Sequence, residues 1–324
     1  MQSRAWRDGA QVAQDFPLEE LDVWLATPEA LVWLDLCQPE PDLLAKLAEE
    51  LGFDPHAVED ALAPRERPKA TRHASHLFFT CYTTDLVQDD AGLWELATSR
   101  VSAFVVRQGL ITVRDGAGLN MAEVLDRWTA DGLWRLGVGG LVHGLLDTIV
   151  DGHFDTIQTM DDALEGLEDL LFDEKIQSAA VQQRVFGMRK ALVQLRRIVL
   201  PMREVVASIQ RMPLEGMPRA LEGYYTDLYD HVIRASEWTE SLRDMVTSVF
   251  ETNLSLQDSR LNTIMKKLAG WGAIIAIPTA VTGWFGQNVP YPGYSEAFGL
   301  YQSAALITVG TVGLFFLFRK FDWL

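Results

Sequence analysis

The chain has 324 residues, of which 48% are hydrophobic, and its formal net charge is −17. This length allows about two domains of ~150 residues each. The acidity argues against nucleic acid as a partner, because phosphate binding requires a basic surface. Residues 268–324 hold two basic and two acidic residues, so the whole excess of negative charge lies in residues 1–267. Such acidity keeps a surface soluble or attracts cations, and the composition leaves both readings open.

Residues 1–135 are predicted to form an α+β domain. Runs rich in aromatic and β-branched residues predict strands at 31–37, 76–87, 93–106 and 109–115. Helical spacing over 41–53 predicts a helix beside them. The first residues contain no apolar signal region, so we expect this domain to stay in the cytoplasm.

The cysteines and histidines of this domain give little indication of a metal site. Cys37 and Cys81 lie in strand-like runs without C-x-x-C spacing, so we expect buried, reduced thiols. His73 and His76 are the only close pair of histidines in the chain and form a weak candidate for metal binding. No P-loop, G-x-G-x-x-G, H-E-x-x-H or G-x-S-x-G pattern occurs. We therefore predict that the protein is not an enzyme and has no covalently bound cofactor.

The next segment, 136–267, is predicted to be a helical stalk. Helical patterns cover 119–130, 139–172, 177–210 and the residues from 219 onward. The apolar run 136–150 is short and contains His143 and Asp147, so we expect a buried helix of the soluble part. Between Arg219 and Phe285 only Pro278 could stop a helix, which predicts a stalk helix that runs directly into a membrane span.

Two uncharged runs, 268–285 and 297–318, are each long enough to cross a bilayer as a helix. The loop between them, 286–296, contains no lysine or arginine, whereas basic residues flank the outer ends of both runs: Lys266, Lys267, Arg319 and Lys320. The positive-inside rule therefore places both flanks and both termini in the cytoplasm. Residues 268–324 are thus predicted to be a two-helix transmembrane domain in the cell membrane.

One face of the long helix carries polar and acidic residues that give way to small ones. Steps of three and four along this face pass through seven candidate pore-lining residues, the pore stripe: Glu251, Asp258, Asn262, Met265, Ala276, Thr279 and Gly283. A solvated stalk face explains only the polar part of the stripe, and a continuous pore lining explains both parts. Two spans enclose nothing alone, so a pore requires a homo-oligomer. The alternative is a helical hairpin that anchors a cytosolic protein.

The loop begins with Gly286, Gln287 and Asn288, which resembles the G-x-N signature of the CorA family of divalent-cation channels. The resemblance extends over most of the chain, through the segments 32–69, 101–116, 224–246, 261–268 and 318–324. It implies a homopentameric, funnel-shaped channel with these three residues at the selectivity mouth. Asp227 matches an acidic residue that takes part in cation sensing at the family's subunit interface. Divalent ions such as Mg²⁺, Co²⁺, Ni²⁺ or Zn²⁺ are then both substrate and regulatory ligand.

Two departures from the family pattern bear on the choice of ion. Gln287 stands where the family usually has methionine, and the loop has Glu296 as its only acidic residue. Such a charge-poor loop is closer to the ZntB branch, which is associated with zinc. We expect a channel or transporter that moves Mg²⁺, with Co²⁺ and Ni²⁺ as further substrates, and that is gated by cations binding its acidic cytoplasmic domain. A zinc transporter of the ZntB type and a membrane-anchored, non-conducting sensor or scaffold remain the alternatives.

Overall fold

The structure, a computed structural model, describes the chain except for residues 65, 91, 172–177 and 212–217. The described residues form two compact units, Met1–Val249 and Phe250–Leu324. The long helix α7 (Leu221–Phe285) contributes to both units, as predicted from the absence of stop signals.

A seven-stranded sheet lies at the centre of the first unit. Its strands are β1 (Gln2–Arg7), β2 (Ala10–Gln14), β3 (Ala30–Cys37), β4 (Lys69–Arg72), β5 (Leu77–Gln88), β6 (Trp94–Val106) and β7 (Gly109–Arg114). They are ordered β2-β1-β3-β7-β6-β5-β4, and β3 pairs with β7 in parallel while the other described pairs are antiparallel. The four predicted strands are confirmed as β3, β5, β6 and β7.

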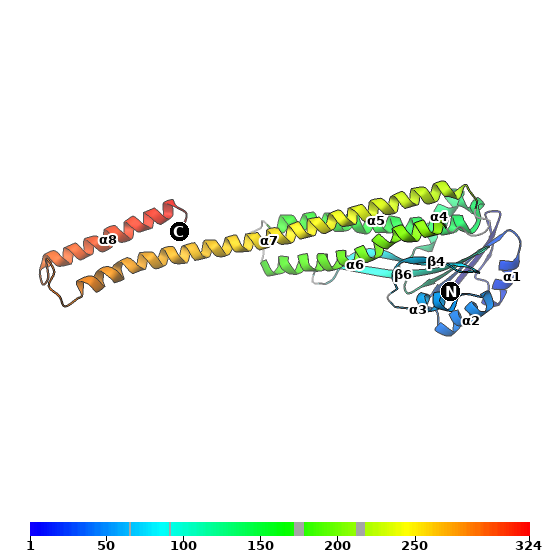
Figure 1. Cartoon of the computed structure of the whole chain (residues 1–324), viewed down its shortest axis with the longest axis horizontal. Helices are drawn as coiled ribbons and strands as arrows, with labels where there is room; N and C mark the ends of the chain where they lie inside the picture. Colours follow the sequence, from blue (N-terminus) through cyan, green and yellow to red (C-terminus); the bar gives the residue numbers. More distant parts are fainter. Residues whose placement is uncertain (65, 91, 172–177, 212–217) are drawn as a thin grey trace. The chain divides into compact units, whose positions relative to one another are not determined.

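Helices cover both faces of this sheet (Figure 1). On one face lie η1 (Leu18–Glu20), α1 (Leu21–Ala26), α2 (Pro41–Leu51) and α3 (Pro55–Leu62). On the other lie α4 (Met121–Ala130), η2 (Leu133–Leu136), α5 (Gly137–Leu171), α6 (Ser178–Arg211) and the beginning of α7. Each face of the sheet has its own hydrophobic core, because successive side chains of a strand point to opposite faces. In β5, Phe78 packs in the core beneath α1, α2 and α3, and Phe79 packs in the core on the opposite face. The predicted α+β domain is therefore a three-layer arrangement in which the later helices form one layer.

The β1–β2 hairpin and the short elements α1, α3 and β4 were not predicted from the sequence. The hairpin turn is formed by Asp8 and Gly9, whose φ angles are 53° and 78°. An Asp-Gly pair is a strong hairpin signal because both turn residues need positive φ. Asp54 caps α3 by accepting a hydrogen bond from the His56 N–H at 2.9 Å, and Pro55 follows at the first helical position.

One of the two thiol predictions is wrong. Cys81 is buried, and burial raises the pKa of its thiol. Cys37 is exposed, because it is the last residue of β3, where the strand leaves the sheet. The rings of His73 and His76 stack with centroids 4.7 Å apart, and each has its own partner: Asp54 for His73 and Ser75 for His76.

Among the described residues, three helices are long and apolar enough to cross a membrane. The most apolar window of Leu133–Leu170 is 72% buried inside the protein, compared with 11% for Leu221–Phe285 and 0% for Ala297–Lys320. The first is therefore a core helix of the first unit, and the burial predicted for 136–150 is confirmed. The other two keep their apolar surfaces uncovered within the chain, as expected of membrane spans.

The buried His153 of α5 leads to a prediction about pH. Its Nε2 lies 2.8 Å from the Tyr82 carbonyl oxygen, and burial lowers its pKa from 6.5 to about 4. Below pH 6.5, His153 binds a proton in the unfolded chain but stays neutral in the folded protein. The free energy of unfolding should therefore fall as the pH is lowered from 6.5 to 4, by up to about 3 kcal/mol.

Urea unfolding of the detergent-solubilised protein at pH 7, 5.5 and 4.5 measures this loss. His153→Gln keeps an N–H donor without a titrating ring, and it should flatten the dependence on pH. An equal fall in stability for the variant and the parent protein would contradict the assignment.

Candidate pore mouth and metal cluster

The second unit is a hairpin of two helices, the end of α7 and α8 (Ala297–Lys320). A Cβ added at Gly310 would lie 3.0 Å from the Ile277 side chain, so the two helices approach closely there. Farther along, the rings of Trp271 and Phe315 lie 6.4 Å apart. Small residues thus permit the close packing of this pair.

Helix α7 continues through Pro278, although proline has no backbone N–H to donate to the helix. The hydroxyls nearby bond to backbone carbonyls: Thr282 Oγ1 donates to the Pro278 oxygen at 2.8 Å, and Thr279 Oγ1 donates to the Ile275 oxygen at 3.1 Å. Thr279 therefore uses its proton locally and keeps oxygen lone pairs on the exposed surface.

The loop between the helices is held by aromatic rings and by the backbone. The Gly286 N–H donates to the Thr282 oxygen at 2.9 Å, and a Cβ at Gly286 would lie only 2.9 Å from that same oxygen. The Tyr291 hydroxyl donates to the Phe285 oxygen at 3.0 Å, and its ring meets those of Phe285 and Tyr294 edge-on. A glycine is therefore required at the turn, and uncharged contacts fix the loop.

The pore mouth, defined as Gly286, Gln287 and Asn288, is exposed in the single chain. The seven residues of the pore stripe are exposed as well: Glu251, Asp258, Asn262, Met265, Ala276, Thr279 and Gly283. The four predicted juxtamembrane basic residues are also exposed: Lys266, Lys267, Arg319 and Lys320. The fold of one chain therefore leaves these positions accessible, and their roles stay predictions.

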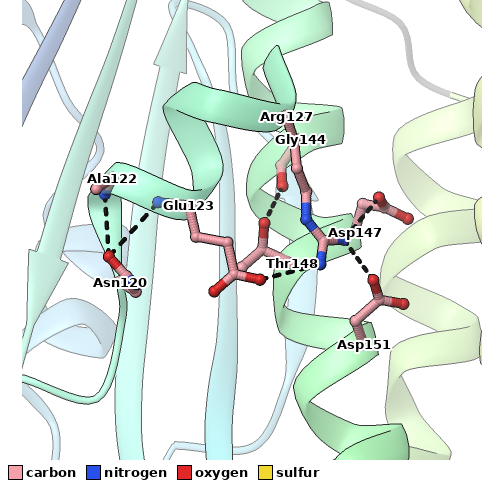
Figure 2. A network of polar contacts seen from close by, with 8 residues as sticks. All are labelled: Asn120, Ala122, Glu123, Arg127, Gly144, Asp147, Thr148 and Asp151. Atoms are coloured by element: carbon pink, nitrogen blue, oxygen red, sulfur yellow. Dashed lines mark hydrogen bonds and ion pairs between the residues drawn. The ribbon is translucent and has the colours of Figure 1, made fainter. Parts of the chain in front are cut away.

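A polar network in the first unit joins α4 to α5 (Figure 2). Asn120 caps α4 by accepting hydrogen bonds from the N–H groups of Ala122 and Glu123. One turn after Glu123, Arg127 donates to Glu123 at 3.0 Å and to Asp147 at 3.3 Å, and it also bonds Asp151. The Arg127 guanidinium therefore forms ion pairs with three carboxylates.

Asp147 and Asp151 also lie close to His231 of α7. Their oxygens and one ring nitrogen of His231 all lie within 4.8 Å of one another, an arrangement that could hold a metal ion. We call these three residues the Asp/His cluster. Beside it is a cavity of about 350 Å³, lined by Arg127, Asp151, Phe154, Asp155, His231 and Arg234.

Burial controls the protonation of the groups around the cluster. It raises the pKa of Asp147, and the nearby carboxylate of Asp151 adds to the rise. It lowers the pKa of His143, one turn earlier in α5, whose Nε2 donates to the Tyr224 oxygen at 3.2 Å. Arg127 opposes the rise in the pKa of Asp147, because its positive charge favours the ionised carboxylate.

The predicted sensing residue, Asp227, lies next to this cluster. Its carboxylate is 3.7 Å from Nε2 of His231, and its side chain is 75% exposed, so a partner outside the chain can reach it. The Asp/His cluster was not predicted from the sequence. Asp147–Asp151 and Asp227–His231 are pairs four residues apart, which share one helix face, but the pairing of α5 with α7 brings them together.

Comparisons with known proteins support the same family. The model of the CorA-like Mg²⁺ transporter protein family matches residues 28–320. The cobalt/magnesium transport protein CorA of Thermotoga maritima is 26% identical over 286 residues, which cover 87% of this chain and 80% of the relative. The zinc transport protein ZntB of Yersinia enterocolitica is 25% identical over 318 residues, covering 93% and 90%.

Solved structures share the fold. The complete structure of the CorA magnesium transporter from Methanocaldococcus jannaschii matches with a TM-score of 0.74 and 21% identity, over 99% of this chain and 98% of that chain. The match includes the sheet domain, the long helix and the terminal hairpin. By the extent of the family match, this chain belongs to the CorA-like Mg²⁺ transporter family, whose members are divalent-cation transporters and not enzymes.

Proposed function

We propose that the protein is a homopentameric channel or transporter that moves Mg²⁺, with Co²⁺ and Ni²⁺ as further substrates, across the cell membrane. Both termini lie in the cytoplasm in this proposal, which follows the basic flanks of the two spans. The observation that carries it is the pore mouth: an exposed amide, Asn288, lies on an uncharged turn at the end of the helix that bears the pore stripe.

A neutral mouth suits an ion that holds its water tightly. Mg²⁺ sheds its water ligands reluctantly and demands octahedral geometry. A ring of carboxylates could bind it too strongly to conduct, because conduction requires binding that is weak enough to release the ion. A ring of Asn288 side-chain carbonyls instead accepts hydrogen bonds from the water of a hydrated ion. The carboxyl-terminal end of α7 directly precedes this loop, and the negative end of the helix dipole favours cations without a formal charge.

The test is ion uptake into proteoliposomes that contain the full-length protein and a Mg²⁺-sensitive dye, repeated with a Zn²⁺-sensitive dye. Mg²⁺ entry above that of protein-free liposomes is the expected result. Zn²⁺ entry without Mg²⁺ entry would assign the protein to the zinc branch. Entry of neither ion would favour the membrane-anchored sensor or scaffold.

The second candidate, Zn²⁺ transport, is favoured by one observation, the charge-poor loop. Glu296 is its only acidic residue, and Gln287 replaces the usual methionine of the signature. The sequence identity to the zinc transport protein, 25%, is close to the 26% identity to the cobalt/magnesium transport protein. The choice between the ions therefore depends on the uptake measurement.

Gating by cytosolic cations leads to a prediction for Asp227. Acidic stalks in an oligomer repel one another, and Mg²⁺ bridging Asp227 between subunits would hold the closed state. In the parent protein, Mg²⁺ should slow limited proteolysis of the cytoplasmic unit. In Asp227→Ala, the proteolysis rate with Mg²⁺ should equal the rate without it. Glu222→Ala, another exposed acidic change on the same helix, should keep the protection. A parent protein without any Mg²⁺-dependent protection would refute this gating mechanism.

A further inference from the structure

Two consecutive helices of the first unit carry opposite charge. Helix α5 contains eight acidic residues and no lysine or arginine, whereas α6 contains seven basic residues and one acidic residue, Glu204. The chain as a whole has a formal net charge of −17, so α6 is a basic helix in an acidic protein. Such a helix attracts acidic partners.

The basic side of α6 also exposes apolar side chains. Steps of three and four residues place five residues on one side of the helix, which we call the α6 face: Phe186, Arg189, Lys190, Val193 and Arg197. The side chain of Phe186 is 69% exposed and that of Val193 is 41% exposed, and the three basic residues are exposed as well. An exposed aromatic ring beside arginines is typical of a protein–protein interface.

The positive charges of the α6 face are not neutralised within the chain. Arg196, on another side of the same helix, pairs with Glu240 of α7 at 2.6 Å. Arg189, Lys190 and Arg197 form no ion pair with any of the described residues. The α6 face is therefore free to pair with acidic groups of another molecule.

An acidic face with matching spacing lies on α5. Asp162, Glu165 and Asp169 are exposed, share one side of the helix and form no ion pair within the described part of the chain. We call them the α5 face. Asp162 and Asp169 lie about 11 Å apart along the helix axis, and so do Lys190 and Arg197 of the α6 face, at a rise of about 1.5 Å per residue. The two faces can therefore pair charge with charge.

We propose that the α6 face of one copy of the chain docks against the α5 face of a second copy. The partner must be acidic, and the chain itself carries an unpaired acidic face with the required spacing, whereas an anionic membrane would repel the rest of this acidic protein. Because two different faces meet, the contact is head-to-tail, the type that can close a ring of identical subunits.

This contact rests on the homo-oligomer of the proposed function and adds a surface to it. It joins side chains directly, so it needs no metal ion, unlike the proposed bridge at Asp227. It should therefore persist in a chelator and weaken in concentrated salt, because salt screens exposed charges.

Cross-linking between two co-expressed full-length chains tests the contact. One chain carries Val193→Cys and the other Glu165→Cys, both with Cys37→Ser to remove the exposed native thiol, and different tags identify mixed pairs. A short bis-maleimide should link the two chains in detergent, with or without a chelator. The matched control replaces Val193→Cys with Val12→Cys. Val12 is 47% exposed but lies on β2, so it should give little mixed product.

Charge reversal makes the test specific. Lys190→Glu on the Val193→Cys chain should lower the cross-linking yield by about threefold or more, because like charges at an interface repel. Asp162→Lys or Asp169→Lys on the other chain, according to the direction in which the helices meet, should restore most of the yield. For the two chains without charge reversal, about 1 M salt should also lower the yield. This comparison serves if a charge variant does not fold.

The outcomes separate this contact from the proposed function. Light scattering that shows an oligomer, together with no link above the Val12→Cys control, would overturn the contact and leave the proposed transport standing. A yield that responds neither to charge reversal nor to salt would overturn it as well. A monomer would refute both the homo-oligomer and this contact. Failure of Mg²⁺ uptake by a protein that cross-links as expected would refute only the transport.

A lipid-facing α6 would give a different result. A fluorophore attached to Val193→Cys would then shift its emission to the blue in vesicles of anionic lipid, but not in vesicles of zwitterionic lipid, and no cross-link would form. That outcome would overturn docking between copies.

Discussion

Replacing Asn288 with alanine should reduce Mg²⁺ uptake into proteoliposomes to the level of protein-free liposomes. Alanine removes the only side-chain carbonyl at that position of the ring, and an ion at the mouth would lose the acceptor for its water. The backbone turn should survive, because Gly286 and the Tyr291 hydrogen bond to Phe285 hold it.

Three measurements make this expectation specific. Gln287→Met should keep substantial uptake, since methionine is the usual residue of the signature. Asn288→Asp should bind Mg²⁺ more tightly and conduct it more slowly, because a carboxylate ring holds the ion. If Asn288→Ala takes up Mg²⁺ as fast as the parent protein, ion passage does not depend on this ring, and the proposed role of Asn288 is wrong.

The second large effect is expected at a buried ion pair in the sheet. Asp35 of β3 is 1% exposed and accepts hydrogen bonds from Arg114 Nε at 2.8 Å and Nη2 at 2.6 Å. Thr112 of β7 donates to the same carboxylate at 2.7 Å, and the Trp33 ring N–H donates to Thr112. This network joins the only described pair of parallel strands.

Arg114→Met should lower the free energy of unfolding by about 3–5 kcal/mol, because it leaves a buried carboxylate without its partner. Asp35→Leu in the same chain should recover much of this loss, since a well-packed apolar pair needs no compensation. Urea unfolding followed by tryptophan fluorescence measures both variants. A single variant as stable as the parent protein would mean that solvent reaches Asp35.

The sequence predicted the elements whose signal is local. β3, β5, β6 and β7 are apolar enough to be recognised alone, and α7 has no stop signal before Phe285. The strands β1 and β2, which form one end of the sheet, were missed because they are largely polar and are recognised only through their turn. The exposure of Cys37 was missed because it depends on where β3 ends.

The candidate sites differ in the same way. The pore mouth could be predicted because three adjacent residues follow a span and resemble a family signature, and its role stays a prediction. The Asp/His cluster was missed because Asp147 and Asp151 belong to α5 and His231 to α7, and no local pattern states that these two helices pack together. Even so, Asp227, chosen by resemblance, lies 3.7 Å from a member of that cluster.

The way in which the loop is held has a consequence for experiments. Residues 286–296 contain no lysine, arginine or histidine, and Glu296 is the only charged residue among them. Contacts between rings and backbone hydrogen bonds are hardly screened by dissolved salt, whereas ion pairs between exposed side chains are. The shape of this loop should therefore be the same in dilute buffer and in concentrated salt, so a difference in ion uptake between such solutions reflects the ions and the charged stalk rather than a rearranged mouth.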